Sequence, residues 1–101
     1  MSETIPELNR VVHERVRLAI LSALVGSGAH TFVELKEVTG ATDGNLSAHL
    51  TTLEKSGCVT IKKSFEGKRP KTTIDVTVAG RRALGEYMNA LERILKLGER
   101  R

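Results

Sequence analysis

Residues 42–55, TDGNLSAHLTTLEK, combine a narrow apolar stripe with a face of short hydrogen-bonding side chains. At about 100° per residue, Leu46, Leu50 and Leu53 fall on one side of a helix. The opposite side carries glycine, alanine and small hydroxyl groups, where surface helices usually carry long charged side chains. Such a face can fit closely against a surface that has its own donors and acceptors. We expect it to enter the major groove of duplex DNA, which is about 12 Å wide.

Short polar side chains in the N-terminal half of such a helix can reach base edges, and an Asn can bind adenine at two points. Asn45 and His49 are therefore the main candidates for reading bases. The supplementary candidates for DNA contact in this helix are Thr42, Ser47, Ala48, Thr51, Thr52 and Lys55. Three alternatives stay open: the Ser and Thr side chains are ordinary surface, His49 is a half-buried packing residue, and Lys55 is solvated or lies beside a phosphate.

The start of this helix, around residues 42–44, suits a phosphate group. Free backbone amides and the positive end of the helix dipole point outward there. Asp43 departs from this expectation, because its charge repels phosphate unless it caps the helix or accepts from a cytosine amine.

Residues 62–71, KKSFEGKRPK, hold five Lys and Arg residues and one Glu, so this segment carries +4 and the rest of the chain sums to zero. A localised positive lobe indicates attraction to a polyanion. Lys68 and Arg69 at its tip would reach flanking phosphates or the minor groove, while Lys62 and Lys71 would contact the DNA backbone. The alternative is a solvated hairpin kept basic to discourage edge pairing.

Other chemistry has little support in the sequence. His13, His30, His49 and Cys58 lack the spacing of metal ligands. The sequence has no glycine-rich phosphate loop, nucleophile elbow or paired carboxylates. We therefore expect neither an enzyme nor a cofactor, and we interpret Cys58 as a small core residue rather than a redox switch.

The chain length of 101 residues allows one domain, over residues 1–101, with one modest core. A single cysteine excludes an internal disulfide and indicates a reducing compartment. The N-terminal sequence lacks the apolar run of a secretory signal, and no stretch approaches the roughly 18 apolar residues of a membrane span. These features predict a cytoplasmic protein that does not contact membranes.

The N-terminal part of the chain predicts two helices. Ser2 or Thr4 can cap a short initial helix that has Pro6 in its first turn. Residues 11–28 form the second helix, which the glycines within residues 26–28 would end. Its apolar residues cover so much of the circumference that we expect it to be central in the fold.

A helix-turn-helix follows. Thr31 and Glu34 make a T-x-x-E capping box, which opens a helix that Gly40 stops. Thr42 can cap the next helix, which runs to Gly57. Two helices joined by a short turn containing glycine form the helix-turn-helix arrangement.

The periodicity then changes to alternation. Residues 58–65 and 71–77 alternate inward apolar with outward polar side chains, and the cluster EGKRP at 66–70 is a turn. This pattern predicts a β-hairpin with a basic tip. Thr77 can cap a last helix over about residues 78–97.

The order of helix, helix-turn-helix and basic hairpin is that of a winged helix. The residues from about Val11 to Leu95 resemble winged-helix transcriptional regulators related to the MarR and ArsR families, in their short single-domain form. The most specific motif is N-L-S-A-H-L-x-x-L-E-x-x-G-x-V, followed by K-R-P and T-x-x-G. The resemblance implies an α+β, mainly α, fold with a three-helix core and a wing over about 11–77. It also implies that the wing positions the protein while the helix discriminates between sequences.

The last helix, over residues 78–97, carries a heptad-like apolar seam. Its candidate interface residues are Leu84, Tyr87, Met88, Leu91, Ile94 and Leu95. One interpretation is that the helix folds back on its own core. We favour the other, a C-terminal dimerisation helix, because a homodimer would place two recognition helices about 34 Å apart on a pseudo-palindromic site.

These features predict a homodimeric regulator that binds duplex DNA sequence-specifically, with repression the more usual outcome. Two alternatives stay open: a winged helix used for protein–protein assembly, and a protein that compacts DNA without reading sequence. The sequence identifies no small-molecule effector and no operator.

Overall fold

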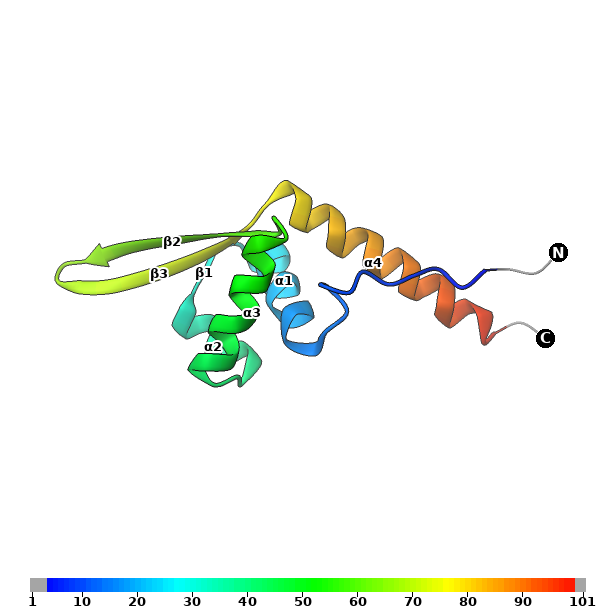
Figure 1. Ribbon diagram of the computed structural model, residues 1–101, viewed down its shortest axis with the longest axis horizontal. Coiled ribbons are helices and arrows are strands. Elements are labelled where there is room, and N and C mark those ends of the chain that lie inside the picture. The colour runs from blue at the N-terminus through cyan, green and yellow to red at the C-terminus, as the bar shows by residue number, and fades with distance from the viewer. Residues whose placement is uncertain (1–3, 100–101) are drawn as a thin grey trace.

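The computed structural model describes residues 4–99, whose helices and strands follow the order of a winged helix (Figure 1). The elements are α1 (Arg15–Ser27), β1 (His30–Thr31), α2 (Phe32–Thr39), α3 (Asp43–Lys55), β2 (Val59–Glu66), β3 (Arg69–Val76) and α4 (Val78–Leu97). The first three helices form the body. The β2–β3 hairpin, called the wing below, projects from one end of the body and α4 from the other (Figure 1). The predicted α+β, mainly helical class is confirmed.

Three helices begin at the threonines that the sequence indicates. At the start of α2, Thr31 Oγ1 accepts from the N–H of Glu34 at 3.1 Å, and Glu34 Oε1 accepts from the N–H of Thr31 at 2.8 Å. This capping box also lowers the pKa of the Glu34 carboxyl, chiefly through the hydrogen bond from the Thr31 backbone. Thr42 and Thr77 cap α3 and α4 by accepting from the backbone N–H three residues later.

The short initial helix is not formed over residues 4–9, and Ser2, one of its two proposed caps, lies outside the described residues. Asn9 organises a turn instead. Its Oδ1 accepts from the N–H groups of Val11 and Val12 at 2.8 and 3.2 Å. A side-chain acceptor of this kind competes with a helix for backbone donors, so this prediction was wrong.

The central helix is present but begins later than predicted, because Glu14 acts as its N-cap. The Glu14 carboxylate accepts from the N–H of Arg17 at 2.7 Å. Gly28 follows the last turn with φ +87°, whereas Gly26, which lies in the other predicted terminator position, is helical.

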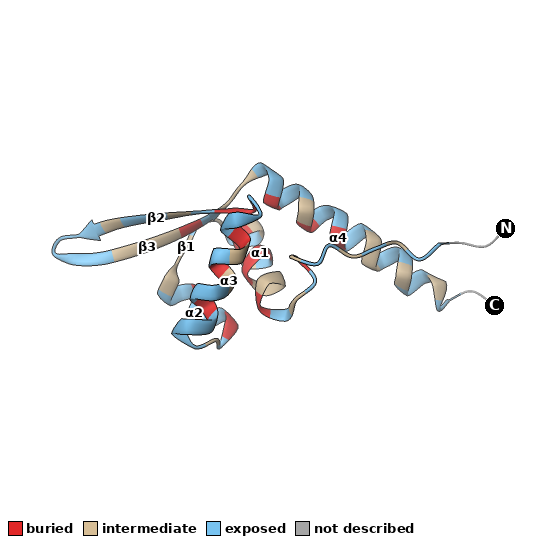
Figure 2. Cartoon of the chain, in the orientation of Figure 1, coloured by how far each residue is buried: buried red, intermediate tan, exposed pale blue. Residues whose placement is uncertain are grey.

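The core lies where α1 meets the other helices and the base of the wing (Figure 2). Its largest fully buried side chains are Val12, Ile20, Leu21, Leu24, Leu35, Leu46, Leu53 and Ile74. Three of these belong to α1, which confirms its central position. In α3 the predicted stripe of Leu46, Leu50 and Leu53 is the buried side, so the opposite side faces solvent.

The sheet contains a strand that the sequence analysis missed. β1 pairs with β3 through His30 and Thr31, which makes a three-stranded antiparallel sheet in the order β1-β3-β2. Two residues are too few to show an alternating pattern, so only their pairing partner identifies them as a strand.

The turn of the wing is shorter than the predicted 66–70 segment. Glu66 pairs with Arg69, and Phe65 pairs with Pro70, so only two residues connect the strands. Gly67 has φ +65°, as the first position of a type II′ hairpin turn requires. The Glu66–Arg69 pair closes the turn, so the next pair, Phe65–Pro70, is a non-hydrogen-bonded pair of the antiparallel ladder. Pro70 has no N–H, and at this position the pairing with β2 does not need one.

Candidate nucleic-acid interface

The outer face of α3 is a surface of small side chains. Its predicted contact residues fall into an exposed group, Thr42, Asn45, Ser47, Ala48, Thr51 and Lys55, and a half-buried pair, Thr52 and His49. The long side chains on this face, Glu54 and Lys55, both stand in the last turn of the helix. The helix can therefore approach another surface closely along most of its length.

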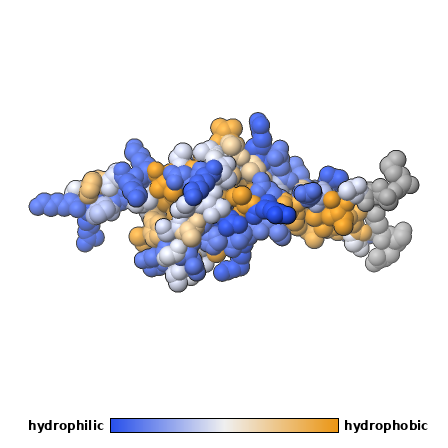
Figure 3. Space-filling view, viewed as in Figure 1, coloured by the Kyte–Doolittle hydropathy of each residue, from blue (hydrophilic) through white to orange (hydrophobic). Residues whose placement is uncertain are grey.

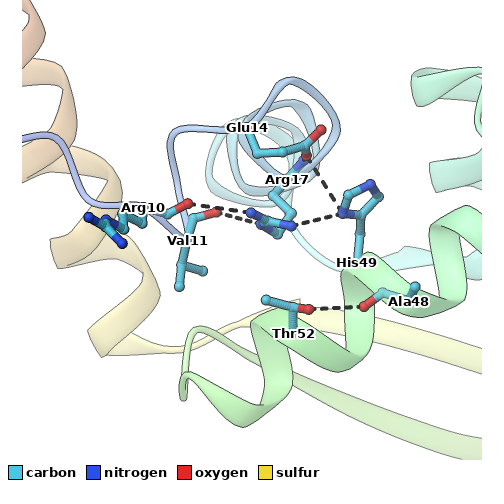
Figure 4. A network of polar contacts seen from close by, with 7 residues as sticks. All are labelled: Arg10, Val11, Glu14, Arg17, Ala48, His49 and Thr52. Atoms are coloured by element: carbon cyan, nitrogen blue, oxygen red, sulfur yellow. Dashed lines mark hydrogen bonds and ion pairs between the residues drawn. The ribbon is translucent and has the colours of Figure 1, made fainter.

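Two threonines of α3 present hydrogen-bond acceptors. The hydroxyl of Thr51 donates to the carbonyl of Ser47 at 3.0 Å, and that of Thr52 donates to the carbonyl of Ala48 at 3.2 Å (Figure 4). Because their protons are engaged by the helix backbone, the hydroxyl oxygens retain lone pairs for a further partner. In a major groove, the matching donors are the exocyclic amines of adenine and cytosine.

The charge of Asp43 at the start of α3 is neutralised by a residue that the sequence analysis missed. Lys36 Nζ, from α2, lies 2.8 Å from Asp43 Oδ1. Thr42 is the cap, so Asp43 does not serve in that role. The pair removes the repulsion that Asp43 alone would exert on a phosphate at this helix end.

His49 points from α3 towards α1 (Figure 4). Its Nδ1 lies 3.0 Å from Nη1 of Arg17 and 3.6 Å from Oε1 of Glu14. A guanidinium only donates, so neutral His49 accepts at Nδ1 and keeps Nε2–H as a donor. This geometry favours the packing interpretation of His49 over its role as a main base reader.

Arg17 connects α3 to the turn that precedes α1. Its Nε donates to the carbonyl of Val11 at 2.6 Å, and its Nη2 donates to that of Arg10 at 3.4 Å. Burial by itself would raise the pKa of Glu14, but the hydrogen bond from the Arg17 backbone and the charge of the Arg17 guanidinium lower the pKa below its ordinary value. Glu14 thus remains ionised at neutral pH, and the network holds α3 against the start of α1.

The wing distributes its charges over two faces, because successive strand residues point to opposite sides. The register places Lys62, Arg69 and Lys71 on the face opposite the core, while Lys68 occupies the turn. Lys71 Nζ lies 3.2 Å from Oε2 of Glu66, so the one acidic residue of the segment is paired.

Lys63 was not among the predicted contacts, yet the structure places it beside α3. It shares a strand face with Val59 and Ile61, which point towards the core. Lys63 lines a groove of about 680 Å³ between α3 and the wing. The other lining residues are Phe32, Ser47, Leu50, Thr51, Glu54, Ile61 and Thr72. Strand alternation would have distinguished Lys63 from Lys62, because only odd-numbered residues of β2 face this groove.

The apolar residues predicted to form the dimer seam of α4 are partly buried within the subunit and partly exposed. Leu84 and Tyr87 are each only 5 % exposed within one subunit, and Tyr87 Oη lies 2.9 Å from Nδ1 of His13. These two residues therefore pack on their own core, as the alternative interpretation held, and their assignment to a dimer interface was wrong. The reason is that the first turns of α4 contact α1.

The distal half of α4 differs from the proximal half. Met88 is 59 % exposed and Leu95 is 63 % exposed, while Leu91 and Ile94 are half-buried. Figure 3 shows apolar atoms gathered at the end of the molecule that α4 occupies, on the right of the view. Large apolar side chains left in water on one helix mark a surface for contact.

Residues 4–99 contain neither a membrane-spanning helix nor a cluster of metal ligands. No helix in this part of the chain has the length and apolar character needed to cross a membrane. Within the same residues, no three His, Cys, Asp or Glu side chains are grouped as a metal site would require. Cys58 is buried in the core, as predicted.

Comparisons with known proteins agree with this architecture. An uncharacterised protein of Methanocaldococcus jannaschii is 39 % identical over 87 residues, which are 86 % of this chain and 95 % of that protein. The solved structure of a transcriptional regulator homologue from Pyrococcus horikoshii is similar with a TM-score of 0.81 and 26 % identity, covering 87 % of each chain. A putative transcriptional regulator from Thermoplasma acidophilum gives a TM-score of 0.68 and 29 % identity, covering 90 % of this chain and 93 % of that one.

The predicted resemblance to winged-helix transcriptional regulators is thus confirmed. These neighbours are regulators rather than enzymes, in agreement with the prediction. The family model described as a winged helix DNA-binding domain matches residues 16–95, which include all the helices and strands except the ends of α1 and α4. Together with the helix-turn-helix and the basic wing, this match shows that the chain belongs to the winged helix DNA-binding domain family.

Proposed function

We propose that this protein is a sequence-specific transcriptional regulator that binds duplex DNA as a homodimer. In this proposal α3 enters the major groove, and the wing contacts the flanking backbone or the minor groove. A dimer seated on a promoter blocks access to it, so repression is the proposed outcome.

The observation that carries the proposal is that α3 and the wing line the same groove. Ser47 and Thr51 line the same groove as Lys63, with Glu54 at its far end on α3. Short hydrogen-bonding groups can reach base edges, whereas lysines attract the phosphates beside them. A duplex presents both kinds of partner side by side, since each groove is bordered by two backbones.

The proposed roles divide between the two elements. Asn45 and the acceptor hydroxyls of Thr51 and Thr52 read bases, with Ser47, Ala48 and the Nε2 edge of His49 beside them. Thr42 and Lys55 lie at the two ends of the helix, near phosphates. The proposed backbone contacts of the wing are Lys62, Lys63, Lys68, Arg69 and Lys71.

The proposed dimer interface is the distal half of α4, with Met88, Leu91, Ile94 and Leu95. The radius of gyration is 15.9 Å, whereas a compact domain of 100 residues has about 13 Å. The excess arises because the wing and α4 extend in opposite directions (Figure 1). A second copy packed on α4 would cover its exposed apolar side chains.

Titration of DNA binding against salt tests this function. If a dimer neutralises about six to eight phosphates, the logarithm of its affinity should fall with the logarithm of salt concentration at a slope of about −6. Fluorescence anisotropy of a labelled duplex, selected by the protein from random sequences, measures the slope. A slope near zero would exclude DNA as the partner and favour a protein–protein assembly module.

The variant Asn45→Ala separates sequence reading from compaction. It should lose roughly 1–3 kcal/mol of binding free energy on the selected duplex and much less on random DNA, because a base contact is absent from random sites. Asn89→Ala, an exposed Asn on α4, is the matched control and should leave both affinities unchanged. An equal loss on both duplexes would show that Asn45 does not read sequence.

A further inference from the structure

The end of the wing carries an exposed apolar pair. Phe65 is 74 % exposed and is the direct cross-strand partner of Pro70. Directly paired side chains lie side by side on one face of a hairpin. The chain has only two Phe, one Tyr and no Trp. Phe32 is half-buried and Tyr87 is buried, so the remaining aromatic ring stands in water, where it adds nothing to the core.

The register places this pair on the side of the wing that faces the groove beside α3. Phe65 has the same strand parity as Ile61 and Lys63, which line that groove. It lies two residues beyond Lys63, or about 7 Å further along the strand. An object that contacts α3 and Lys63 therefore meets the Phe65–Pro70 pair next, towards the tip of the wing.

The surroundings of the pair are cationic. The residues of the segment that carry positive charge are Lys62, Lys63, Lys68, Arg69 and Lys71. The one carboxylate among them, on Glu66, is paired with Lys71 at 3.2 Å. An apolar centre with a positive rim is complementary to a duplex, which has phosphates at the edge of each groove and stacked base faces inside it.

We propose that Phe65 and Pro70 form an apolar wedge that enters the minor groove beside the site read by α3 and partly unstacks one base step. The inference rests on the proposed DNA-binding function and adds to it a contact that phosphate-binding lysines do not make. Insertion of apolar side chains between base steps kinks a duplex towards its major groove. Pyrimidine–purine steps such as TA and CA unstack most readily, so the wedge selects for them at a position that α3 does not touch.

Phe65→Ala tests the wedge, with 2-aminopurine in the selected duplex as the probe. The base analogue replaces adenine at successive flanking steps, and its fluorescence rises where stacking is lost. The wild-type protein should raise the signal at one step, and Phe65→Ala should abolish the rise. The variant should also bind about 10-fold more weakly to a duplex with TA at that step, since it loses the stacking of an aromatic ring on a base. It should lose its preference for TA over AA there.

Two controls keep the test specific. Val78→Ala removes a side chain that is 78 % exposed at the start of α4, and it should change neither the fluorescence nor the affinity. Phe65→Ala removes no charge, so its salt slope should equal that of the wild type, and its melting temperature should be unchanged because the side chain lies outside the core.

Three outcomes would overturn the wedge. In the first, the wild type produces no local fluorescence rise while its salt slope is about −6, which leaves the DNA-binding function intact. In the second, Phe65→Ala keeps the wild-type affinity and step preference. In the third, the variant changes the sedimentation mass instead, which would assign the apolar pair to a protein contact. A wild-type slope near zero would reject the DNA-binding function itself, and the wedge with it.

Discussion

Replacement of Gly80 by alanine should lower the free energy of unfolding by about 3 kcal/mol. A Cβ atom at this position would overlap the carbonyl oxygen of Cys58 and lie 2.8 Å from Cγ2 of Val76. The Cys58 carbonyl cannot move away easily, because it also accepts from the N–H of Thr77 at 2.9 Å. Thr77 in turn donates its hydroxyl to the carbonyl of Gly57 at 2.6 Å. The start of α4 is thus seated directly on the end of the helix-turn-helix.

Gly85→Ala is the matched control for Gly80→Ala in the same helix. A Cβ at Gly85 would meet no group beyond its own turn of helix within 4 Å, so alanine should stabilise the helix by up to about 1 kcal/mol. Thermal and urea unfolding measure both variants, and Gly80→Ala should lower the melting temperature by roughly 10–20 °C. If Gly80→Ala has the same melting temperature as the wild type, α4 does not pack against Cys58 as described.

Leu95→Glu should convert the proposed dimer into monomers. Leu95 is 63 % exposed in one subunit, so the variant should fold normally. In a dimer the carboxylate would be buried without a partner, at a cost of several kcal/mol. A monomer binds only one half-site at a time. It lacks the high effective concentration that a dimer has at its second half-site, so affinity for a duplex with two half-sites should fall by about 10²–10⁴-fold. Sedimentation gives the mass, and anisotropy gives the affinity.

The control for this variant places the same charge elsewhere on α4. Val78 is 78 % exposed at the first position of the helix, away from the distal seam. Val78→Glu should keep the wild-type mass, since an acidic residue at a helix N-terminus is favourable. Leu91 is less suitable for this test because it packs partly against the core. An unchanged mass for Leu95→Glu would show that α4 is not the dimer interface.

Local sequence signals determined most of the secondary structure. The caps at Thr31, Thr42 and Thr77 depend on an N–H only three residues away, so they can be recognised without knowledge of the fold. Gly40 and Gly67 adopt positive φ where a helix or strand must stop. The leucine stripe of α3 follows from the helical repeat alone, and it determines which face of the helix remains exposed.

Tertiary structure decided the features that depend on distant partners. The helical repeat determines which side chains share a face, but it does not identify the element that packs against that face. His49 faces α1 because Arg17 stands there, and β1 is a strand because β3 lies beside it. Asp43 is neutralised from α2, across the turn that brings Lys36 to the start of α3.

The apolar seam of α4 shows the same division. Heptad spacing from the sequence predicted one continuous apolar face on this helix. Only the fold decided that its first half, with Leu84 and Tyr87, packs against α1, while Met88 and Leu95 extend beyond the body. The physical reason is that spacing within a helix is a local property, whereas burial depends on how far the neighbouring helix reaches.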